Sequence, residues 1–144
     1  MQNGDIERAN EFLGRKFLCT GNVFEGLKLG RKMGFPTLNI SIKNEHKILP
    51  KDGVYAVQVR MKGELIDGMM NIGQNPTVSK ENTIAKKIEI HLFDFNQDVY
   101  GEDVTILFHK FIRNEKTFSN LEALKSQLIQ DEILVRQFFN SAIL

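Results

Sequence analysis

The residues from Gly30 to Asn39 combine the side chains that a phosphate-binding site needs. The segment reads Gly-Arg-Lys-Met-Gly-Phe-Pro-Thr-Leu-Asn. Glycines let backbone N–H groups approach an anion, while the two cations neutralise its charge. Pro36 forces Phe35 into an extended conformation, so Thr37 and Asn39 project on one face of the strand that follows. A hydroxyl beside an amide oxygen indicates Mg²⁺ bound with a substrate phosphate, although an ordinary glycine-rich surface loop is the simpler alternative.

A glutamate in an otherwise apolar strand is the second candidate. Glu89 and His91 alternate with Ile88, Ile90 and Leu92. Burial raises the pKa of a carboxyl group toward the range useful for a general base, which makes Glu89 the candidate base. A solvent-facing glutamate on the outer face of a sheet explains the pattern equally well. A single histidine in a strand is more often structural than catalytic.

Two cations and an aromatic ring form a third cluster shortly before the C-terminal segment. Arg113 and Lys116 are suited to binding phosphate, and Phe118 offers a ring to a planar ligand. The alternative is a charged turn in which Phe118 packs as a hydrophobic staple ahead of a helix capped by Ser119.

The composition is that of one soluble domain. The chain has 144 residues, of which 42% are hydrophobic and 26% charged, and its formal net charge is +1. This charge gives no general attraction to nucleic acid or to a membrane surface, and no apolar run is long enough to span a bilayer. Cys19 is the single cysteine, which excludes an internal disulfide and suits a reducing compartment; we expect it in the core. These features predict a cytoplasmic protein.

Hydrophobic periodicity predicts an all-β architecture followed by a helix. Alternating apolar residues predict strands at 17–24, 38–43, 54–61, 65–72, 88–95 and 104–108. The segment 73–87 lacks apolar periodicity, and we expect a long, mobile polar loop there. A short helix capped by Asp5 is expected at the N-terminus, and a long one begins at the capping box of Ser119. About six strands and one long helix indicate a small antiparallel barrel with a helical appendage.

Taken in chain order, these segments resemble the riboflavin kinase family. The resemblance covers nearly the whole chain and rests on six collinear pieces: Gly30–Asn39, Gly53–Tyr55, Asn71–Gly73, Glu89–Phe95, Tyr100–Gly101 and Arg113–Phe118. Two positions depart from the family pattern. Leu38 stands where the family usually has Ala, and Asn114 where Pro is common.

The resemblance implies a six-stranded antiparallel Greek-key barrel with a C-terminal helix. It also implies transfer of the ATP γ-phosphoryl group to the ribityl 5′-hydroxyl of riboflavin, which gives FMN and ADP. The implied site has Glu89 as general base, Mg²⁺ on Thr37 and Asn39, ATP on Gly26, Gly30, Arg31, Gly34, Thr37, Leu92, Asp94 and Tyr100, and flavin on Arg113, Lys116 and Phe118.

The N-terminal residues are similar to a linker found in bacterial bifunctional FAD synthetases. In those proteins this kinase is the C-terminal module, so residues 1–144 are expected to form a riboflavin kinase domain in which 1–14 are a linker helix. An N-terminal FMN adenylyltransferase module is then the expected partner in the full-length protein. The alternative function is a non-catalytic small barrel that binds a flavin or nucleic acid, and the near-zero net charge argues against nucleic acid.

Overall fold

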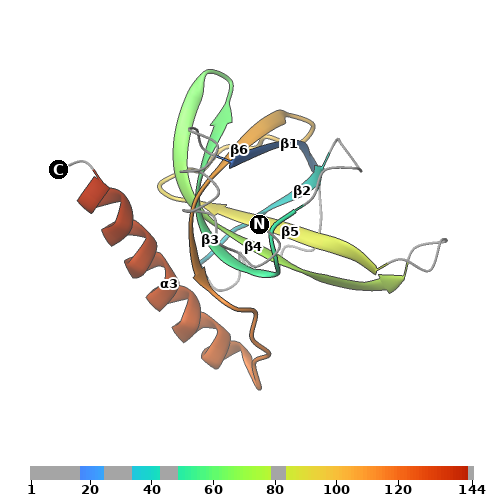
Figure 1. Ribbon diagram of the computed structural model, residues 1–144, viewed down its shortest axis with the longest axis vertical. Coiled ribbons are helices and arrows are strands. Elements are labelled where there is room, and N and C mark those ends of the chain that lie inside the picture. Colours follow the sequence, from blue (N-terminus) through green and yellow to red (C-terminus); the bar gives the residue numbers. More distant parts are fainter. Residues whose placement is uncertain (1–16, 25–33, 43–48, 79–83, 143–144) are drawn as a thin grey trace.

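Six strands close into an antiparallel barrel, and one long helix lies against the outside of the barrel (Figure 1). This description comes from a computed structural model that describes residues 17–24, 34–42, 49–78 and 84–142. The N-terminal helix expected from Asp5 lies outside these ranges. No helix in these ranges is long and apolar enough to cross a membrane.

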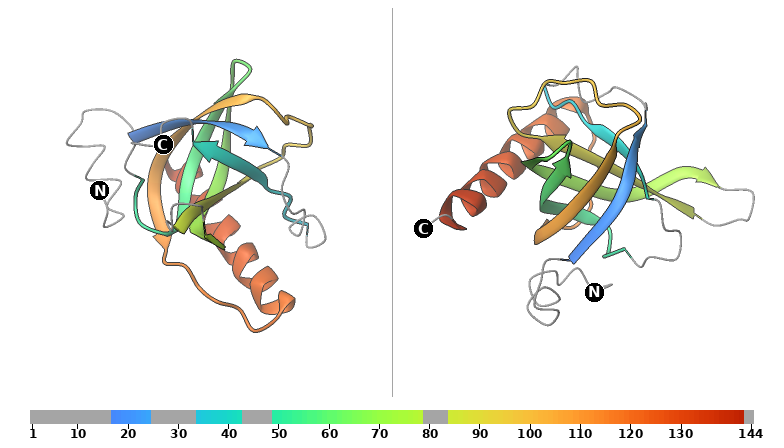
Figure 2. Two further views of the ribbon diagram at one scale, coloured as in Figure 1. Left: turned by 90° about the vertical axis from the view of Figure 1, so that its right-hand side faces the viewer. Right: turned by 90° about the horizontal axis from the view of Figure 1, so that it is seen from above.

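The strands follow a Greek-key order around the barrel. They are β1 (Phe17–Phe24), β2 (Leu38–Ile42), β3 (Gly53–Met61), β4 (Glu64–Val78), β5 (Ile84–Leu92) and β6 (Asp103–Arg113), and the helix is α3 (Leu121–Ala142). The closed order is β1-β2-β5-β4-β3-β6 (Figure 2). β3, β4 and β5 pair consecutively, and β6 returns to pair with β3, which is the Greek-key connection. The expected fold class is confirmed.

The interior of the barrel is filled by every second residue of each strand. Side chains that point inward from β1, β3 and β6 include Cys19, Val57 and Ile106, each fully buried. Ile40 of β2 and Ile90 of β5 point inward as well. Because side chains alternate across a strand, their polar neighbours on β2 and β5 lie on the outer face. The alternation therefore places the predicted site outside the barrel, and the core position expected for Cys19 is confirmed.

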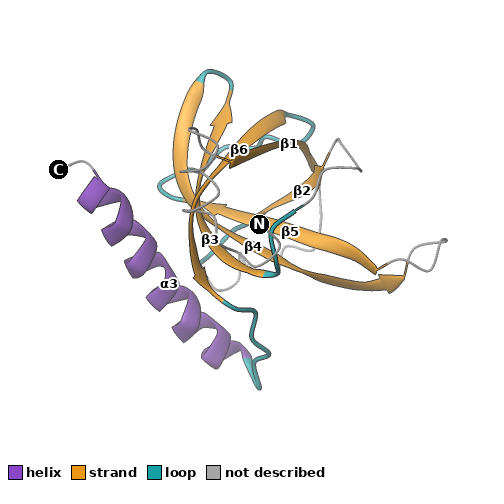
Figure 3. Cartoon of the chain, in the orientation of Figure 1, coloured by secondary structure: helices purple, strands orange, loops and turns teal. Residues whose placement is uncertain are grey.

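Helix α3 covers part of the outer face through a second, smaller apolar cluster. Val135 and Phe139 of the helix pack against Ala56 of β3, Met69 of β4 and Phe93, which follows β5. Figure 3 shows the helix running beside the barrel wall. These contacts anchor the helix to the outer face of the barrel.

The segment 73–87 differs from the expected polar loop. β4 continues to Val78 and β5 begins at Ile84, so this part of the chain is mainly a hairpin that projects beyond the barrel (Figure 1). Gly73 pairs with Lys87 in the ladder that joins the two strands. Backbone hydrogen bonds hold this hairpin together, and such bonds leave no apolar period in the sequence. The prediction of a loop is wrong for the described part of the segment.

Helix α3 begins one residue later than the capping box predicts. Asn120 Oδ1 accepts a hydrogen bond from the N–H of Ala123 at 2.8 Å, and the carbonyl of Asn120 accepts one from the N–H of Leu124 at 3.3 Å. Asn120 is therefore the N-cap, and the predicted cap at Ser119 is wrong. Serine and asparagine cap helices about equally well, so the sequence does not separate them. Phe118 then does not directly precede the cap, which removes the staple interpretation.

Candidate functional site

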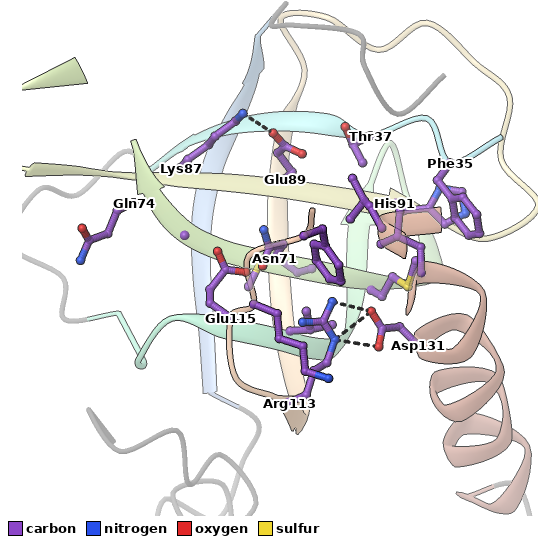
Figure 4. A pocket seen from close by; sticks show the side chains of 18 residues that line it. Phe35, Thr37, Asn71, Gln74, Lys87, Glu89, His91, Arg113, Glu115 and Asp131 are labelled. Carbon is purple, nitrogen blue, oxygen red and sulfur yellow. Dashed lines mark hydrogen bonds and ion pairs between the residues drawn. The ribbon is translucent and has the colours of Figure 1, made fainter. Parts of the chain in front are cut away.

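A cavity of about 390 Å³ lies between the outer face of the barrel and helix α3 (Figure 4). Strands β4 and β5 form one wall, and the segment after β6 together with the first half of α3 forms the other. The lining residues are Phe35, Thr37, Val54, Met69, Met70, Asn71, Gly73, Gln74, Lys87, Glu89, His91, Arg113, Glu115, Lys116, Phe118, Leu124, Leu128 and Asp131. The cavity brings together Thr37, Glu89 and all three residues of the predicted flavin cluster.

Glu89 lies on the outer face of β5, between the two neighbouring strands. It pairs in register with Asn39 of β2 on one side and with Asn71 of β4 on the other. Its side chain is 24% exposed, and its Oε1 accepts an ion-pair contact from Lys87 Nζ at 2.8 Å. The expectation of an acid surrounded by apolar residues is therefore met only in part: the carboxylate opens to the cavity and has a fixed cationic neighbour.

Thr37 and Asn39 lie close to the glutamate, as the resemblance requires. Asn39 is 7% exposed, an unusual burial for an amide side chain, and it stands directly opposite Glu89. Thr37 is half-buried and lines the cavity. The three side chains offer a hydroxyl, an amide and a carboxylate oxygen, which is the donor set preferred by Mg²⁺. Among the described residues, no group of three His, Cys, Asp or Glu side chains is arranged to hold a metal on its own.

Arg113 is fixed by helix α3. Its Nε donates to Asp131 Oδ1 at 2.9 Å, its Nη2 donates to Asp131 Oδ2 at 2.8 Å, and its Nη1 donates to the carbonyl of Asn114 at 3.0 Å. Asp131 is fully buried and also accepts a hydrogen bond from Gln127. These contacts occupy the edge of the guanidinium, and Arg113 Cζ lies 5.9 Å from the centroid of the Phe118 ring.

Gly73 and Asn71, on the β4 side of the cavity, lie next to Glu115, which belongs to the segment after β6. A Cβ atom placed on Gly73 would lie 2.6 Å from Glu115 Oε2, so a glycine is needed there for the carboxylate to approach β4. Burial of this carboxyl raises the pKa of Glu115; the positive charge of Arg113 opposes the rise, and the negative charge of Asp52 adds to it. A hydrogen bond from Asn71 also opposes the rise.

Asn71 contributes an unused acceptor to the same wall. Its Oδ1 is buried, and it is the one buried side-chain polar atom in the described part of the chain without a hydrogen-bond partner. An unsatisfied buried acceptor costs about 1–3 kcal/mol. A hydrogen-bond donor on a bound molecule would therefore gain more free energy by pairing with Asn71 Oδ1 than by making an ordinary surface contact.

A second cavity, of about 510 Å³, lies on the other side of Thr37. Its lining residues are Pro36, Thr37, Leu38, Leu92, Phe95, Asn96, Gln97, Asp98, Val99 and Tyr100. Three residues of the predicted ATP set, Thr37, Leu92 and Tyr100, thus share one cavity. Because Thr37 lines both cavities, a molecule in the first and a molecule in the second would meet at this residue.

Asp94 and Gly34 of the predicted ATP set do not line the second cavity. Asp94 lines a third depression and forms hydrogen bonds with Arg136 of α3 at 3.2 and 3.3 Å, and these lower the pKa of Asp94. Gly34 is exposed, with a φ of 82° that suits glycine. Gly26, Gly30 and Arg31 lie outside the described residues.

Several lining residues were not identified from the sequence. Glu115 lies between two residues that were, Arg113 and Lys116, and its charge resembles that of an ordinary turn. Asp131 had a detectable signal, because it falls on the apolar stripe of the helix that also carries Leu128 and Val135. An acid on the buried face of a helix needs a cationic partner, and this partner is Arg113.

The sequence matches the model of a known family over most of its length. The family is Flavokinase, described as riboflavin kinase, and the match covers residues 13–139. Two curated relatives are bifunctional riboflavin kinase/FMN adenylyltransferases. The Bacillus subtilis protein is 40% identical over 98% of this chain, and the Haemophilus influenzae protein is 42% identical over 98% of it. The chain spans 44% of the length of each of these relatives.

Solved structures share the fold. A macrolide-efflux protein from Streptococcus pneumoniae superimposes with a TM-score of 0.86 and 32% identity, over 94% of this chain and 43% of that one. Riboflavin kinase from Trypanosoma brucei superimposes with a TM-score of 0.56 and 25% identity, over 85% of this chain and 79% of that one. The family match, the curated relatives and the barrel with its outer cavity agree, and the chain belongs to the riboflavin kinase family.

Proposed function

We propose that this chain is a riboflavin kinase, which transfers the γ-phosphoryl group of ATP to the ribityl 5′-hydroxyl of riboflavin and releases FMN and ADP. The observation that carries the proposal is the pair of cavities that share Thr37 as a common wall. Phosphoryl transfer needs a donor and an acceptor held in line, more than it needs a strong base. Two adjoining cavities with a base beside their junction meet this requirement.

The first cavity suits the flavin. Its apolar residues, among them Met69, Leu124 and Leu128, can bury a planar ring, and Phe118 provides an aromatic surface. The flat face of Arg113, held by Asp131, adds a second surface for stacking. In this arrangement Arg113 and Phe118 contact the ring system, and the ribityl chain extends toward Glu89.

The second cavity suits ATP. Leu92 and Tyr100 would lie beside the nucleotide, and Thr37 would lie at its phosphate end, at the junction of the two cavities. Gly34, and the predicted loop residues Gly26, Gly30 and Arg31, would add backbone N–H groups and positive charge to the phosphates. Asp94 would not line this cavity, because its carboxylate forms an ion pair with Arg136 of α3.

Thr37 and Asn39 would hold Mg²⁺ through their oxygen atoms, with the phosphates completing the coordination. A magnesium ion supplies charge neutralisation on the transferred phosphoryl group. Glu89 would then accept the proton of the ribityl hydroxyl, and Lys87 would keep the carboxylate oriented. The position of Glu89 opposite Asn39 supports this division of roles, because it puts the base next to the metal ligands.

The relatives support a larger protein with a second activity. Their names combine riboflavin kinase with FMN adenylyltransferase, and the chain spans less than half of their length. We therefore propose an FMN adenylyltransferase module as partner in the full-length protein, with this chain supplying FMN. We place the reaction in the cytoplasm, where ATP is available and the buried thiol of Cys19 stays reduced.

The direct test is to incubate the chain with riboflavin, ATP and Mg²⁺ and to separate the products by chromatography. FMN and ADP are expected in equal amounts, and no FMN is expected when ATP or Mg²⁺ is left out. Binding of riboflavin without any FMN would instead support a non-catalytic flavin-binding barrel.

Glu89→Gln tests the base. Since a general base contributes about 10²–10⁴-fold, kcat is expected to fall by about 100-fold or more, with little change in the KM for riboflavin. Glu64→Gln, at an exposed position where β4 begins, is the matched control and should leave kcat unchanged. A folded Glu89→Gln variant with the turnover of the native chain would disprove the assigned role.

A further inference from the structure

Lys87 lines the first cavity and contacts the proposed base directly. Its Nζ lies 2.8 Å from Glu89 Oε1, and in Figure 4 its side chain points along β5 toward that carboxylate. The lysine side chain is 42% exposed, so a bound molecule can reach the ammonium. An ammonium has three N–H donors, and the contact with Glu89 uses one of them. Lys87 therefore has donors to offer to a bound anion.

The other cations that line the cavities are engaged on the side of helix α3. In the described lining of the two cavities, the lysines and arginines are Lys87, Arg113 and Lys116. Arg113 is held by Asp131, and Lys116 Nζ donates to Gln127 Oε1 at 3.2 Å. The described lining of the second cavity contains no lysine or arginine. Lys87 is thus the described cation placed to meet a phosphate beside the proposed base.

A phosphate at this place would lie among carboxylates. Glu89 and Glu115 both line the first cavity. Burial, together with the negative charges of Asp52 and Glu89, raises the pKa of Glu115, so the two lining carboxylates are close enough to repel each other. A phosphate monoester carries about −1.5 to −2 charges at neutral pH. Such a group adds to the repulsion unless a cation offsets its charge, and Lys87 supplies a cation there.

The proposed reaction brings a phosphoryl group to this cation. Glu89 takes the proton of the ribityl 5′-hydroxyl, the oxygen of that hydroxyl forms a bond to the γ-phosphorus, and the bond from this phosphorus to ADP breaks with its electron pair staying on ADP. A general base lies within about 2.6–3.2 Å of the hydroxyl that it deprotonates. The hydroxyl oxygen and the Lys87 ammonium therefore contact the same carboxylate, and the new phosphoryl group lies within reach of the flexible lysine side chain.

We propose that Lys87 is a catalytic residue, whose ammonium binds the transferred phosphoryl group and afterwards the 5′-phosphate of FMN. The ammonium keeps its protons throughout and contributes only charge and hydrogen bonds. Riboflavin has no phosphate, so this contact distinguishes the product from the substrate. The role rests on the proposed function, which places the ribityl hydroxyl at Glu89, but the contact with FMN is measurable without turnover.

Lys87→Met tests the contact, because it removes the charge and retains an unbranched side chain. With ADP and Mg²⁺ present, calorimetry is expected to give a Kd for FMN raised by about tenfold and a Kd for riboflavin within about twofold of the native value. The lost contact is a charge-assisted hydrogen bond at a partly exposed lysine, which solvent and salt screen. The difference in FMN affinity should therefore shrink in about 1 M salt.

Lys86→Met is the matched control. Lys86 lies next to Lys87 in β5, is absent from the lining of both cavities and pairs with Asp52 Oδ1 at 2.6 Å. Its substitution removes the same charge from the chain and should leave both Kd values unchanged. Lys87→Arg retains a cation and should keep the Kd for FMN within about threefold of the native value. Thermal unfolding of each variant shows whether it is folded.

The rate of transfer gives a second measurement. The chain is kept in excess over riboflavin, so that release of FMN does not limit the rate. Under these conditions Lys87→Met is expected to form FMN about tenfold more slowly than the native chain, because charge on the transferred group is less well neutralised. Lys86→Met should form FMN at the native rate.

The outcomes separate this proposal from the proposed function. If Lys87→Met weakened the binding of FMN and riboflavin equally, or of neither, the phosphate contact would be overturned even in a chain that makes FMN. The same conclusion would follow if Lys86→Met had the effect of Lys87→Met. A folded native chain that makes no FMN, but loses FMN affinity through Lys87→Met alone, would contradict the proposed function and support the phosphate contact.

Discussion

At the scale of single residues, Asp131 and Glu115, two of the three carboxylates that line the first cavity, differ in how their charges are compensated. Asp131 is fully buried and has three hydrogen-bond contacts from Arg113, whereas Glu115 lies against Gly73 with weaker compensation. A buried charge is tolerated only when it is paired and hydrogen-bonded. The first carboxylate meets this condition and joins the helix to the barrel; the second is exposed on one side, and its partial desolvation against β4 raises the pKa of Glu115.

Asp131→Ala is expected to destabilise the chain by about 3–5 kcal/mol, because it leaves the half-buried charge of Arg113 without its carboxylate partner. Urea denaturation measures the loss. The double variant Arg113→Met with Asp131→Leu removes both charges and should recover most of the stability. A double variant as unstable as the single one would show that the ion pair itself, and not the unpaired charge, determines the loss.

Glu115→Gln is expected to stabilise the chain at neutral pH, by less than about 1 kcal/mol because the residue is largely exposed to screening by solvent. The pKa of Glu115 is higher in the folded chain than its ordinary value, so the folded chain binds more protons between these two values. Its stability therefore falls as the pH rises through that interval, and the cost is fully present above it.

Urea denaturation of the native chain and of Glu115→Gln over a pH series checks this sign. The advantage of the variant should shrink as the pH is lowered through the raised pKa of Glu115. Glu64→Gln, at an exposed position, is the control and should show no comparable trend. If the stability advantage of Glu115→Gln over the native chain increased as the pH was lowered, the predicted sign would be wrong.

At the scale of elements, the start of helix α3 determines where one wall of the first cavity lies. The segment from Asn114 to Asn120 leaves the barrel, passes over the cavity and is fixed at its end by the cap of Asn120. The cap satisfies a backbone N–H of the first turn and so defines where this segment stops. The positions of Lys116 and Phe118 in the cavity lining therefore depend on where the helix begins.

Asn120→Ala is expected to destabilise the chain by about 1 kcal/mol, the usual cost of removing an N-cap side chain. Ser119→Ala should change the stability by less than about 0.5 kcal/mol, since Ser119 is exposed and is not the cap. Urea denaturation of the two variants compares them directly. The opposite ranking would assign the cap to the serine.

The strands were predictable where one face is buried and the other is polar. The alternation of Leu38, Ile40 and Ile42 corresponds to β2, and the periodic part of β5 was recognised in the same way. The continuation of β4 to Val78 was not predictable, because its support comes from backbone pairing with another strand. A residue pattern records which side chains are buried, and it does not record which backbones are paired.

At the scale of the whole molecule, the sequence predicted some of the residues that line the first cavity but not others. Glu89 and Asn39 were identified from local patterns, and the barrel places them side by side because β2 and β5 are neighbours in its closed order. Asn71 and Glu115 reach the same cavity only through the register of β4 and the path of the chain after β6. Such positions depend on contacts between distant segments, which a local pattern does not contain.

The closure of the barrel also has a consequence for the order in which the chain folds. Residues Phe17 to Thr20 of β1 pair with β6, whose residues come more than 80 positions later in the sequence. During synthesis the start of β1 must therefore wait, with the apolar side chains of Phe17 and Cys19 uncovered, until β6 has left the ribosome. Long-range pairing of this kind slows folding and leaves an open strand edge in the meantime. Strand β1 is thus the part of the described chain that is most exposed to aggregation before the barrel closes.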